Sequence, residues 1–271
     1  MAQMQDLAGR KALVTGSATG LGRSIAVKLA ERGADLIINC TRSLSEAEET
    51  FAACNALGAQ TQLVAADVST DEGCARLAEA AGQWGRLDIL VNNAGITRHA
   101  RDHSDLDALT RADFLDTYAV NVAGPFLMMQ ATKGLMEQSY KESGRAAVVL
   151  NVSSIAGVTG IGSSVAYAAT KGALNTMTLS LARALAPAIR VNAVCPGFIG
   201  TRWFRDRMDA EQYDRMEEGV AKSTPLQVAS GPDDIADSAI FFLTDASRHV
   251  TGELLLVDAG MHLGYAPLTA R

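Results

Sequence analysis

The sequence predicts a doubly wound α/β fold, in which a parallel sheet of about seven strands is covered by helices on both faces. From Arg10 onward, short apolar runs alternate with longer amphipathic ones, which is the pattern of repeated βα units. The short runs are rich in Leu and β-branched residues at successive positions, as expected of strands buried on both faces. Because no repeat or linker interrupts the 271 residues, we expect one domain spanning 1–271.

The predicted elements alternate along the whole chain. The strands cover 11–16, 35–40, 62–67, 87–93, 146–154, 189–197 and 254–258. The clearest helices between them cover 22–33, 45–58, 110–140 and 165–186. Helix starts are predicted at two capping boxes, Ser45 with Glu48 and Ser69 with Glu72, and helix ends at Gly33 and Gly58.

Composition and charge restrict the classes of protein to which the chain can belong. Apolar residues make up 48% of the chain, enough for a packed core. The net charge of -6 contains no block of one sign, so nucleic acid is not an expected partner. No run reaches the ~18 to 20 apolar residues of a membrane span, and the N-terminus lacks a signal-peptide pattern. Four cysteines without C-x-x-C spacing fit a reduced, cytoplasmic protein.

The segment 200–226 differs from the other connections between predicted strands. It carries charges together with Trp203, Phe204 and Tyr213 in a mostly helical pattern, and it is too long for a simple loop. One interpretation is a mobile flap over a substrate site. The other is a fixed pair of peripheral helices.

A glycine-rich turn joins the first strand to the first helix. Thr15, Gly16, Gly20 and Gly22 form the pattern T-G-x3-G-x-G. Glycines here allow the backbone to approach a pyrophosphate, whose charge meets the N-terminus of the helix. The spacing is not the general fingerprint G-x-G-x-x-G, so a turn that serves only chain reversal is the alternative. The position between a strand and a helix favours dinucleotide binding.

Polar residues also follow later strands, at the edge where open α/β sheets bind ligands. Asp67 follows the third strand and Asn92–Gly95 follows the fourth, although both also fit ordinary turns. The second strand runs into Asn39–Ser43, which contains Arg42 and no carboxylate. A carboxylate there binds the ribose of NAD, whereas an Arg accommodates the 2′-phosphate of NADP, so we expect NADP(H) to be favoured over NAD(H). The alternative is that Arg42 only solvates the start of a helix.

Ser154, Tyr167 and Lys171 form the candidate catalytic group. Ser154 ends the fifth strand, and Tyr167 and Lys171 lie four residues apart on one face of a predicted helix. A tyrosine with its ordinary pKa of about 10 is a poor acid or base at neutral pH, but a nearby ammonium lowers that pKa. Ser154 would hydrogen-bond the reacting oxygen while Tyr167 transfers a proton. Each residue alone has an ordinary explanation; together, behind a dinucleotide turn, they indicate carbonyl or alcohol chemistry.

In the order of its motifs, the chain resembles the short-chain dehydrogenase/reductase family over nearly its whole length. The motifs are TGSATGLG at Thr15–Gly22, Asp67, NNAG at Asn92–Gly95, NVAG at Asn121–Gly124, SSIAG at Ser153–Gly157, YAATK at Tyr167–Lys171 and PGFIGT at Pro196–Thr201. The resemblance implies a single-domain Rossmann fold with Ser154, Tyr167 and Lys171 as catalytic residues, and Asn121 holding a water that links Lys171 to solvent. It implies a cofactor site formed by Gly16, Ser17, Thr19, Gly20, Leu21, Gly22, Thr41, Arg42, Asp67, Val68, Asn93, Ala94, Gly95, Tyr167, Lys171, Pro196, Gly197, Ile199 and Thr201.

The function that the resemblance implies is an NADP(H)-dependent oxidoreductase interconverting a ketone or aldehyde and an alcohol, with Tyr167 as proton donor or acceptor. A small carbonyl or alcohol would be the partner, and the assembly a homotetramer or homodimer. Alternatives are an NAD-dependent alcohol dehydrogenase of the same family, a dinucleotide-sensing module without catalysis, and a lyase or epimerase with a tightly held cofactor.

Three sequence features bear on these expectations. NADP-using relatives often carry a basic residue at the position that Thr19 occupies here. The connector Met136–Arg145 mixes acidic and basic residues, so its charges do not favour docking of an acyl carrier protein. His99 and His103 lie in a polar stretch without a third ligand at suitable spacing, so no metal site is expected.

Overall fold

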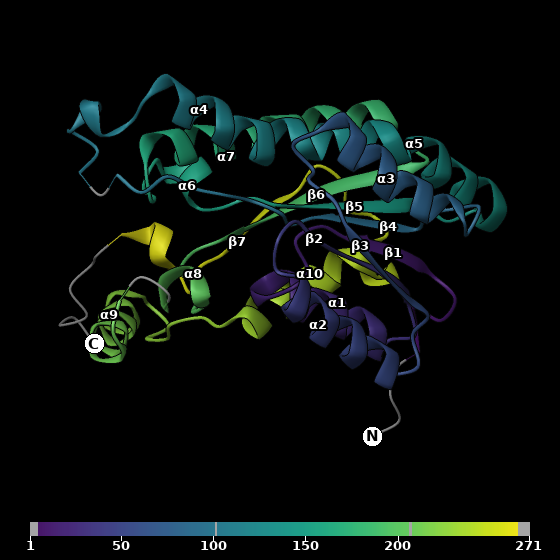
Figure 1. Cartoon of the computed structure of the whole chain (residues 1–271), viewed down its shortest axis with the longest axis horizontal. Helices are drawn as coiled ribbons and strands as arrows, with labels where there is room; N and C mark the ends of the chain where they lie inside the picture. Colours follow the sequence, from purple (N-terminus) through teal and green to yellow (C-terminus); the bar gives the residue numbers. More distant parts are fainter. Residues whose placement is uncertain (1–4, 101, 206–207, 265–271) are drawn as a thin grey trace.

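The computed structural model describes residues 5–100, 102–205 and 208–264. Within them, seven strands form one parallel sheet in the order β3-β2-β1-β4-β5-β6-β7. Figure 1 shows α1, α2 and α10 on one face of this sheet and α3, α4, α5 and α7 on the other. The predicted doubly wound Rossmann fold is therefore confirmed. The strand order reverses between β1 and β4, which is where such sheets bind their ligands.

The elements have the following bounds. The strands are β1 (Lys11–Val14), β2 (Asp35–Cys40), β3 (Thr61–Ala65), β4 (Ile89–Asn92), β5 (Ala147–Val152), β6 (Ile189–Pro196) and β7 (Leu254–Val257). The helices are α1 (Gly20–Glu31), α2 (Leu44–Ala56), α3 (Asp71–Gly82), α4 (Arg111–Tyr118), α5 (Gly124–Ser143), α6 (Ala156–Thr159), α7 (Val165–Leu185), α8 (Arg202–Arg205), α9 (Ala210–Ser223) and α10 (Pro232–Leu243).

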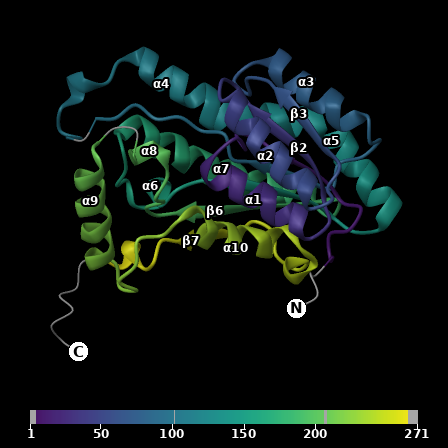
Figure 2. The same ribbon diagram turned by 60° about the horizontal axis from the view of Figure 1, so that its bottom comes forward.

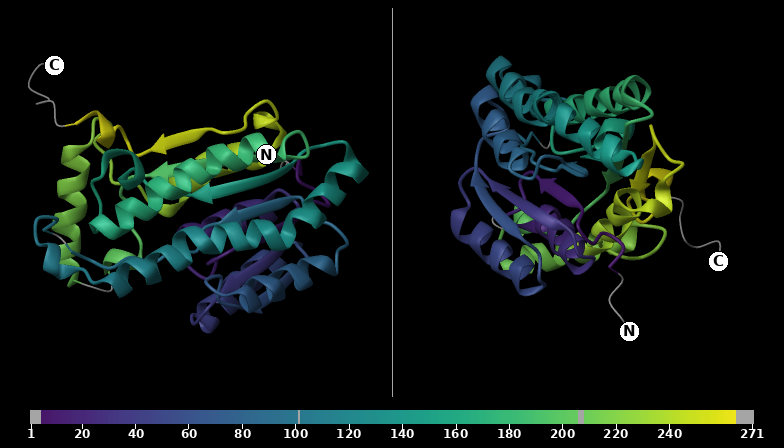
Figure 3. Two further views of the ribbon diagram at one scale, coloured as in Figure 1. Left: turned by 90° about the horizontal axis from the view of Figure 1, so that it is seen from above. Right: turned by 90° about the vertical axis from the view of Figure 1, so that its right-hand side faces the viewer.

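Two apolar layers hold the sheet between its helices. Successive strand residues point to opposite faces, so Leu13 and Ile37 join the layer beneath α3 and α5, whereas Val14 and Ile38 join the layer beneath α1 and α10. All four side chains are fully buried. The view from above in Figure 3 looks onto the long helices α5 and α7, which cover the centre of the sheet. The continuous apolar runs of the sequence follow from this burial on both faces.

The predicted helix starts need correction, although the predicted ends are right. In α2, the Ala47 N–H already bonds the Ser43 carbonyl, so the first turn begins before Ser45. Ahead of α3, the Asp67 carboxylate holds Ser69 in a turn, and Thr70 caps the helix instead. Neither predicted capping box therefore forms. Gly33 and Gly58 lie in the left-handed region, with φ of 89° and 93°, as expected after α1 and α2.

The segment 200–226 folds into the two helices α8 and α9, which confirms its mostly helical pattern. Residues 206 and 207 between them lie outside the described part of the chain. Figure 2 shows α8 and α9 at one end of the molecule, away from α3 and α5. Asp209 begins α9 with a capping box to Gln212.

A buried carboxylate joins the N-terminal ends of β1 and β4, which lie at the edge of the sheet away from the glycine-rich turn. Asp88 is 1% exposed and accepts hydrogen bonds from the Lys11 N–H at 2.7 Å and the Ser139 hydroxyl at 2.6 Å. Arg86 approaches the same carboxylate to 3.4 Å. Because a buried carboxylate needs such partners, Asp88 links β1, β4 and α5 in a single arrangement.

Replacing Asp88 with Ala tests that link. The Lys11 N–H and the Ser139 hydroxyl would lose their acceptor, and we expect the free energy of unfolding to fall by about 3 kcal/mol. Urea denaturation at constant protein concentration measures the change. Glu142→Ala removes an exposed partner of Arg86 and should leave the urea midpoint nearly unchanged. Equal effects of the two substitutions would contradict a special contribution of the buried carboxylate.

Candidate active site

The glycine turn after β1 is shaped so that side chains cannot replace its glycines. Gly16 has φ of 60°, and a Cβ there would lie 2.9 Å from Cα of Ala94. A Cβ on Gly22 would clash with Nδ2 of Asn93 and the carbonyl of Gly16. Gly20, with φ of 57°, opens α1. The glycines therefore let two backbone segments approach closely, as a pyrophosphate site requires.

The start of α1 fits an anion. Thr19 is the N-cap, but its side chain forms no capping hydrogen bond, and the first turn carries no acidic residue. The N–H groups of Gly20, Leu21 and Gly22 therefore point out of the helix end with the positive pole of its dipole behind them. A dinucleotide pyrophosphate fits this helix end.

Asn93 fastens the turn after β4 to the glycine turn. Its amide Nδ2 donates to the carbonyls of Thr15 at 2.9 Å and Gly16 at 2.8 Å. In return, the Thr15 hydroxyl accepts from the backbone N–H groups of Asn93 and Ala94 at 3.0 and 3.1 Å. Asn93 and Ala94 thus hold the two turns together, and these linked turns form the candidate cofactor cradle. Thr15, which motif reasoning treats only as part of the glycine pattern, supports the same candidate cradle.

Asn39, in β2, is a supporting residue that motif reasoning missed. It is 1% exposed, and its Oδ1 accepts from the Gly16 N–H at 3.0 Å. Its Nδ2 donates to the carbonyls of Val64 and Ala66, beside β3. Ser17 completes the link, because its hydroxyl accepts from the Asn39 N–H and donates to the Val14 carbonyl. A polar residue directly after the apolar run Leu36–Ile38 was the available signal.

The ends of β2 and β3 border a hollow of about 360 Å³, whose lining includes Thr41, Ala66, Asp67, Gly73 and Arg76. Asp67 is exposed, and its carboxylate accepts from the N–H and hydroxyl of Ser69, so the turn role is observed. Nothing in that role prevents contact with an adenine.

Arg42 and Val68 directly follow Thr41 and Asp67, two of the residues that line this hollow, in the chain. Arg42 is exposed and forms no ion pair within the described residues. Its guanidinium therefore remains available to a phosphate. Val68 is buried, and its carbonyl accepts from the Cys74 thiol at 3.3 Å.

The segment after β6 closes the other side of the cradle. The carbonyl of Pro196 accepts from the Ile155 N–H at 2.9 Å, and a Cβ on Gly197 would lie 2.7 Å from Cβ of Asp258. Ile199 packs against the apolar layer beneath α1. Thr201 then crosses above Gly20, with its methyl carbon 3.4 Å from the place a Gly20 Cβ would take. Pro196–Thr201 therefore faces the glycine turn, and its contacts with a cofactor stay a prediction.

Ser154, Tyr167 and Lys171 converge beside this cradle. Ser154 follows β5, and its hydroxyl, which accepts from the Ala156 N–H at 3.1 Å, lies close enough to the Tyr167 phenol to lower the pKa of that phenol. The Ser164 hydroxyl caps α7 through the Tyr167 N–H at 3.1 Å, which sets the start of the helix. Lys171, one turn later, is 4% exposed and donates to the Val152 carbonyl at 2.8 Å. Its Nζ lies 5.5 Å from the centre of the Tyr167 ring.

Burial shifts the pKa values of Tyr167 and Lys171. Burial raises the pKa of Tyr167 to about 12, and the neighbouring Ser154 hydroxyl lowers it only in part. Burial also lowers the pKa of Lys171 to about 8, with a smaller opposing effect from Cys195. The net shift of the Tyr167 pKa is therefore upward, because desolvation disfavours the phenolate. The lowering of this pKa by the Lys171 ammonium, which the sequence predicts, stays a prediction.

Asn121 lies in a π-helical turn, Ala119–Ala123, between α4 and α5. The single helix expected over 110–140 is thus interrupted. Asn121 Oδ1 accepts from the Ile96 N–H at 2.9 Å, and Nδ2 donates to the Ile96 carbonyl and to the Thr170 hydroxyl. A Cβ on Gly95 would lie 3.4 Å from Asn121 Oδ1 and 3.8 Å from Lys171 Nζ. Asn121 and Lys171 therefore border the same point beside Gly95.

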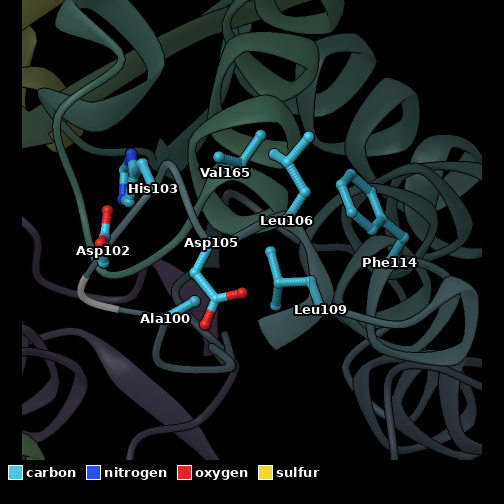
Figure 4. A pocket seen from close by; sticks show the side chains of 8 residues that line it. All are labelled: Ala100, Asp102, His103, Asp105, Leu106, Leu109, Phe114 and Val165. Atoms are coloured by element: carbon cyan, nitrogen blue, oxygen red, sulfur yellow. The ribbon is translucent and has the colours of Figure 1, made fainter.

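Among the described residues, no group of three or more His, Cys, Asp or Glu side chains could hold a metal ion. His103 instead bonds the Gly162 carbonyl at 3.1 Å. Figure 4 shows the adjoining cavity, where Leu106, Phe114 and Val165 supply apolar walls. Its volume of about 60 Å³ is too small for a dinucleotide.

The fold and this site define a dinucleotide-binding α/β protein with an acid–base group at the switch in strand order. A family model described as "Enoyl-(Acyl carrier protein) reductase" matches residues 16–262. The chain belongs to the short-chain dehydrogenase/reductase family and is an NAD(P)-dependent oxidoreductase of the ketoreductase type. In the described part of the chain, no helix is both long and apolar enough to cross a bilayer.

Relatives match this chain over nearly its full length. It is 41% identical to "Granaticin polyketide synthase putative ketoacyl reductase 2" of Streptomyces violaceoruber, over 93% of this chain and 96% of that one. It is 35% identical to the 3-oxoacyl-(acyl-carrier-protein) reductase FabG of Staphylococcus aureus, over 94% and 98%. The solved structure "Pseudomonas aeruginosa RhlG/NADP active-site complex" is 32% identical, with a TM-score of 0.86 over 97% of this chain and 100% of that one.

Gly22→Ala tests the close approach in the glycine turn. The added methyl would push Asn93 and the Gly16 carbonyl apart, and we expect the dissociation constant for the dinucleotide to rise at least about tenfold. Isothermal titration calorimetry measures it. Gly134→Ala in α5 is the matched control, because nothing lies within 4 Å of its Cβ position. That substitution should leave binding unchanged and stabilise the helix by about 0.5–1 kcal/mol. Unaltered binding by Gly22→Ala would contradict the proposed cradle.

Proposed function

We propose that the protein is an NADP(H)-dependent reductase of a ketone or aldehyde, acting reversibly as an alcohol dehydrogenase. The observation that carries this proposal is the convergence of Ser154, Tyr167 and Lys171 beside the glycine turn. When bound, the nicotinamide supplies or accepts the hydride. The residues of the chain then have only to place the carbonyl, exclude water and move one proton.

Tyr167 is the proposed proton donor in reduction. Its raised pKa keeps the phenol protonated at neutral pH, so it enters the reaction as an acid. The Ser154 hydroxyl is placed to hydrogen-bond the substrate oxygen, where negative charge develops. Lys171, at a pKa of about 8, is mostly an ammonium at neutral pH and stabilises the phenolate that forms.

Asn121 has two proposed roles. Its hydrogen bonds to both backbone groups of Ile96 hold the turn that follows Gly95. Its Oδ1 also has a second lone pair next to the point that it shares with Lys171. A water held there would return a proton to Lys171 from solvent. This role follows from the family resemblance and is supported by the proximity of the two side chains.

The proposed preference for NADP(H) has two supports. Arg42 is exposed at the end of β2, where a 2′-phosphate would lie, and the segment carries no carboxylate that would hold an unphosphorylated ribose. The similar solved structure from Pseudomonas aeruginosa is described as an NADP active-site complex. Thr41 adds a hydroxyl beside the same position.

The segment 200–226 is proposed to be a substrate flap. Trp203 contacts the Tyr167 ring edge to face, with 6.4 Å between the ring centres. Phe204 of the same segment packs against Phe198, which directly precedes the segment, with 5.0 Å between the ring centres. These aromatic side chains would cover the carbonyl and keep water from the proton-transfer site.

Self-association is also proposed, as a homotetramer or homodimer. Apolar side chains are exposed on α4, α5 and α7: Phe114, Leu115, Tyr118, Phe126 and Leu179. A surface of this kind supports contact with a second copy. The four cysteines, all buried and free, support a reducing compartment such as the cytoplasm.

Tyr167→Phe removes the phenol oxygen while keeping the ring. We expect turnover of a carbonyl substrate to fall at least about a hundredfold, because the proton donor is lost. The dissociation constant for NADPH should change less than about threefold, which calorimetry checks. Turnover that survives this substitution would exclude Tyr167 as the donor.

The pH profile tests the charge on Lys171. Deprotonation above a pKa of about 8 removes the ammonium that stabilises the phenolate, whereas Tyr167 stays protonated in this range. We therefore expect kcat/KM for carbonyl reduction to be level near neutral pH and to fall as the pH rises through about 8. Circular dichroism at each pH controls for unfolding. A profile that stays level well above this value would show that Lys171 keeps its ordinary pKa.

A further inference from the structure

An ion pair joins the flap to the start of α2. Nη1 of Arg202, the first residue of α8, lies 2.6 Å from Oε1 of Glu46, in the first turn of α2. The two residues are 156 positions apart in the chain. Their side chains are 57% and 30% exposed, so the pair itself adds little to stability. We therefore expect the pair to act on the candidate cofactor site, which it spans.

The pair spans the glycine turn. Thr201, directly before Arg202, crosses above Gly20 at the start of α1. On the far side, the Thr50 hydroxyl of α2 donates to the Ala18 carbonyl at 3.0 Å, which ties α2 to the same turn. Arg202 therefore reaches over the turn toward the helix that follows Arg42.

Glu46 places a negative charge close to the end of β2. Besides burial, the charge of Glu46 raises the pKa of the Cys40 thiol, the last residue of that strand. The hydrogen bond from Arg202 lowers the pKa of Glu46, so the carboxylate is ionised at neutral pH. Thr41 and Arg42 come next in the chain, where the 2′-phosphate of NADP(H) is expected. A phosphate monoester carries about -1.5 to -2 charges at neutral pH, so an uncompensated Glu46 would repel it.

We propose that Arg202 is a specificity-determining residue for NADP(H), because its ion pair neutralises Glu46 beside the 2′-phosphate site. This inference rests on the proposed NADP(H) preference. It makes selection of the cofactor depend on the flap as well as on the β2–α2 connection. Since the flap also carries Trp203, the residue against Tyr167, the same segment meets both ends of the cofactor site.

The experiment is a double-mutant cycle read by cofactor binding. Dissociation constants for NADPH and NADH are measured by calorimetry at low salt for the wild type, Arg202→Gln, Glu46→Gln and the double variant. Arg215→Gln is the matched control, since Arg215 lies in α9 of the same flap and forms an exposed ion pair with Glu211.

The expected pattern is specific to charge compensation. Arg202→Gln should weaken NADPH about three- to tenfold and NADH less than about twofold, because only NADPH meets the uncompensated Glu46. Glu46→Gln should leave NADPH binding unchanged or tighter, and the double variant should return to within about twofold of the wild type. Raising the salt concentration should shrink the NADPH effect.

Other outcomes overturn the inference. Equal loss of both cofactors in Arg202→Gln would mean that the pair only holds the flap. Failure of Glu46→Gln to rescue the double variant would mean that Arg202 contacts the phosphate itself. The proposed NADP(H) preference is tested separately by the wild type, which would bind NADH more tightly than NADPH if that proposal were wrong. The difference between the cofactors in Arg202→Gln remains interpretable in that case.

Discussion

The hydrogen bonds between the turns after β1 and β4 are the constraint on which the rest of the site depends. Asn93 donates to the Thr15 and Gly16 carbonyls, and the Thr15 hydroxyl accepts two N–H groups in return. These turns meet where the strand order reverses, so the crevice opens at this crossing. The contact requires glycine at position 16, because any side chain there would push Ala94 away. The positions of the cradle, of the start of α1 and of Lys171 all depend on this contact between the two turns.

The sequence predicts the fold well because burial on both faces leaves a direct mark. Each central strand is a continuous apolar run, and each such run became a strand of the sheet. Helix starts were less predictable, because neighbouring polar residues compete for the same cap. The Ser69 hydroxyl donates to the Asp67 carboxylate, so Thr70 caps α3 instead of Ser69. The choice depends on a side-chain contact that spacing does not specify.

The site was predictable where its geometry is local and unpredictable where it is not. Tyr167 and Lys171 share a helical face by their spacing alone. Asn39 supports the glycine turn across two strands, and a polar residue in a strand has many ordinary explanations. The contact between Glu46 and Arg202 has no local signal. Spacing also does not give the degree of burial, and burial is what raises the Tyr167 pKa.

The π-helical turn at Ala119–Ala123 has a consequence for how this family member can change in length. Such a turn holds one residue more than an α-helical turn, and here the extra residue presents Asn121 to Ile96 and Thr170. Deleting one residue from this turn would restore regular α-helical hydrogen bonding and leave α5 facing as before, because the wide turn absorbs the extra residue. Met128 and Met136 would then stay buried in the apolar layer. A shortened helix of this kind would keep the packing of α5 and lose the contacts that Asn121 makes with Ile96 and Thr170.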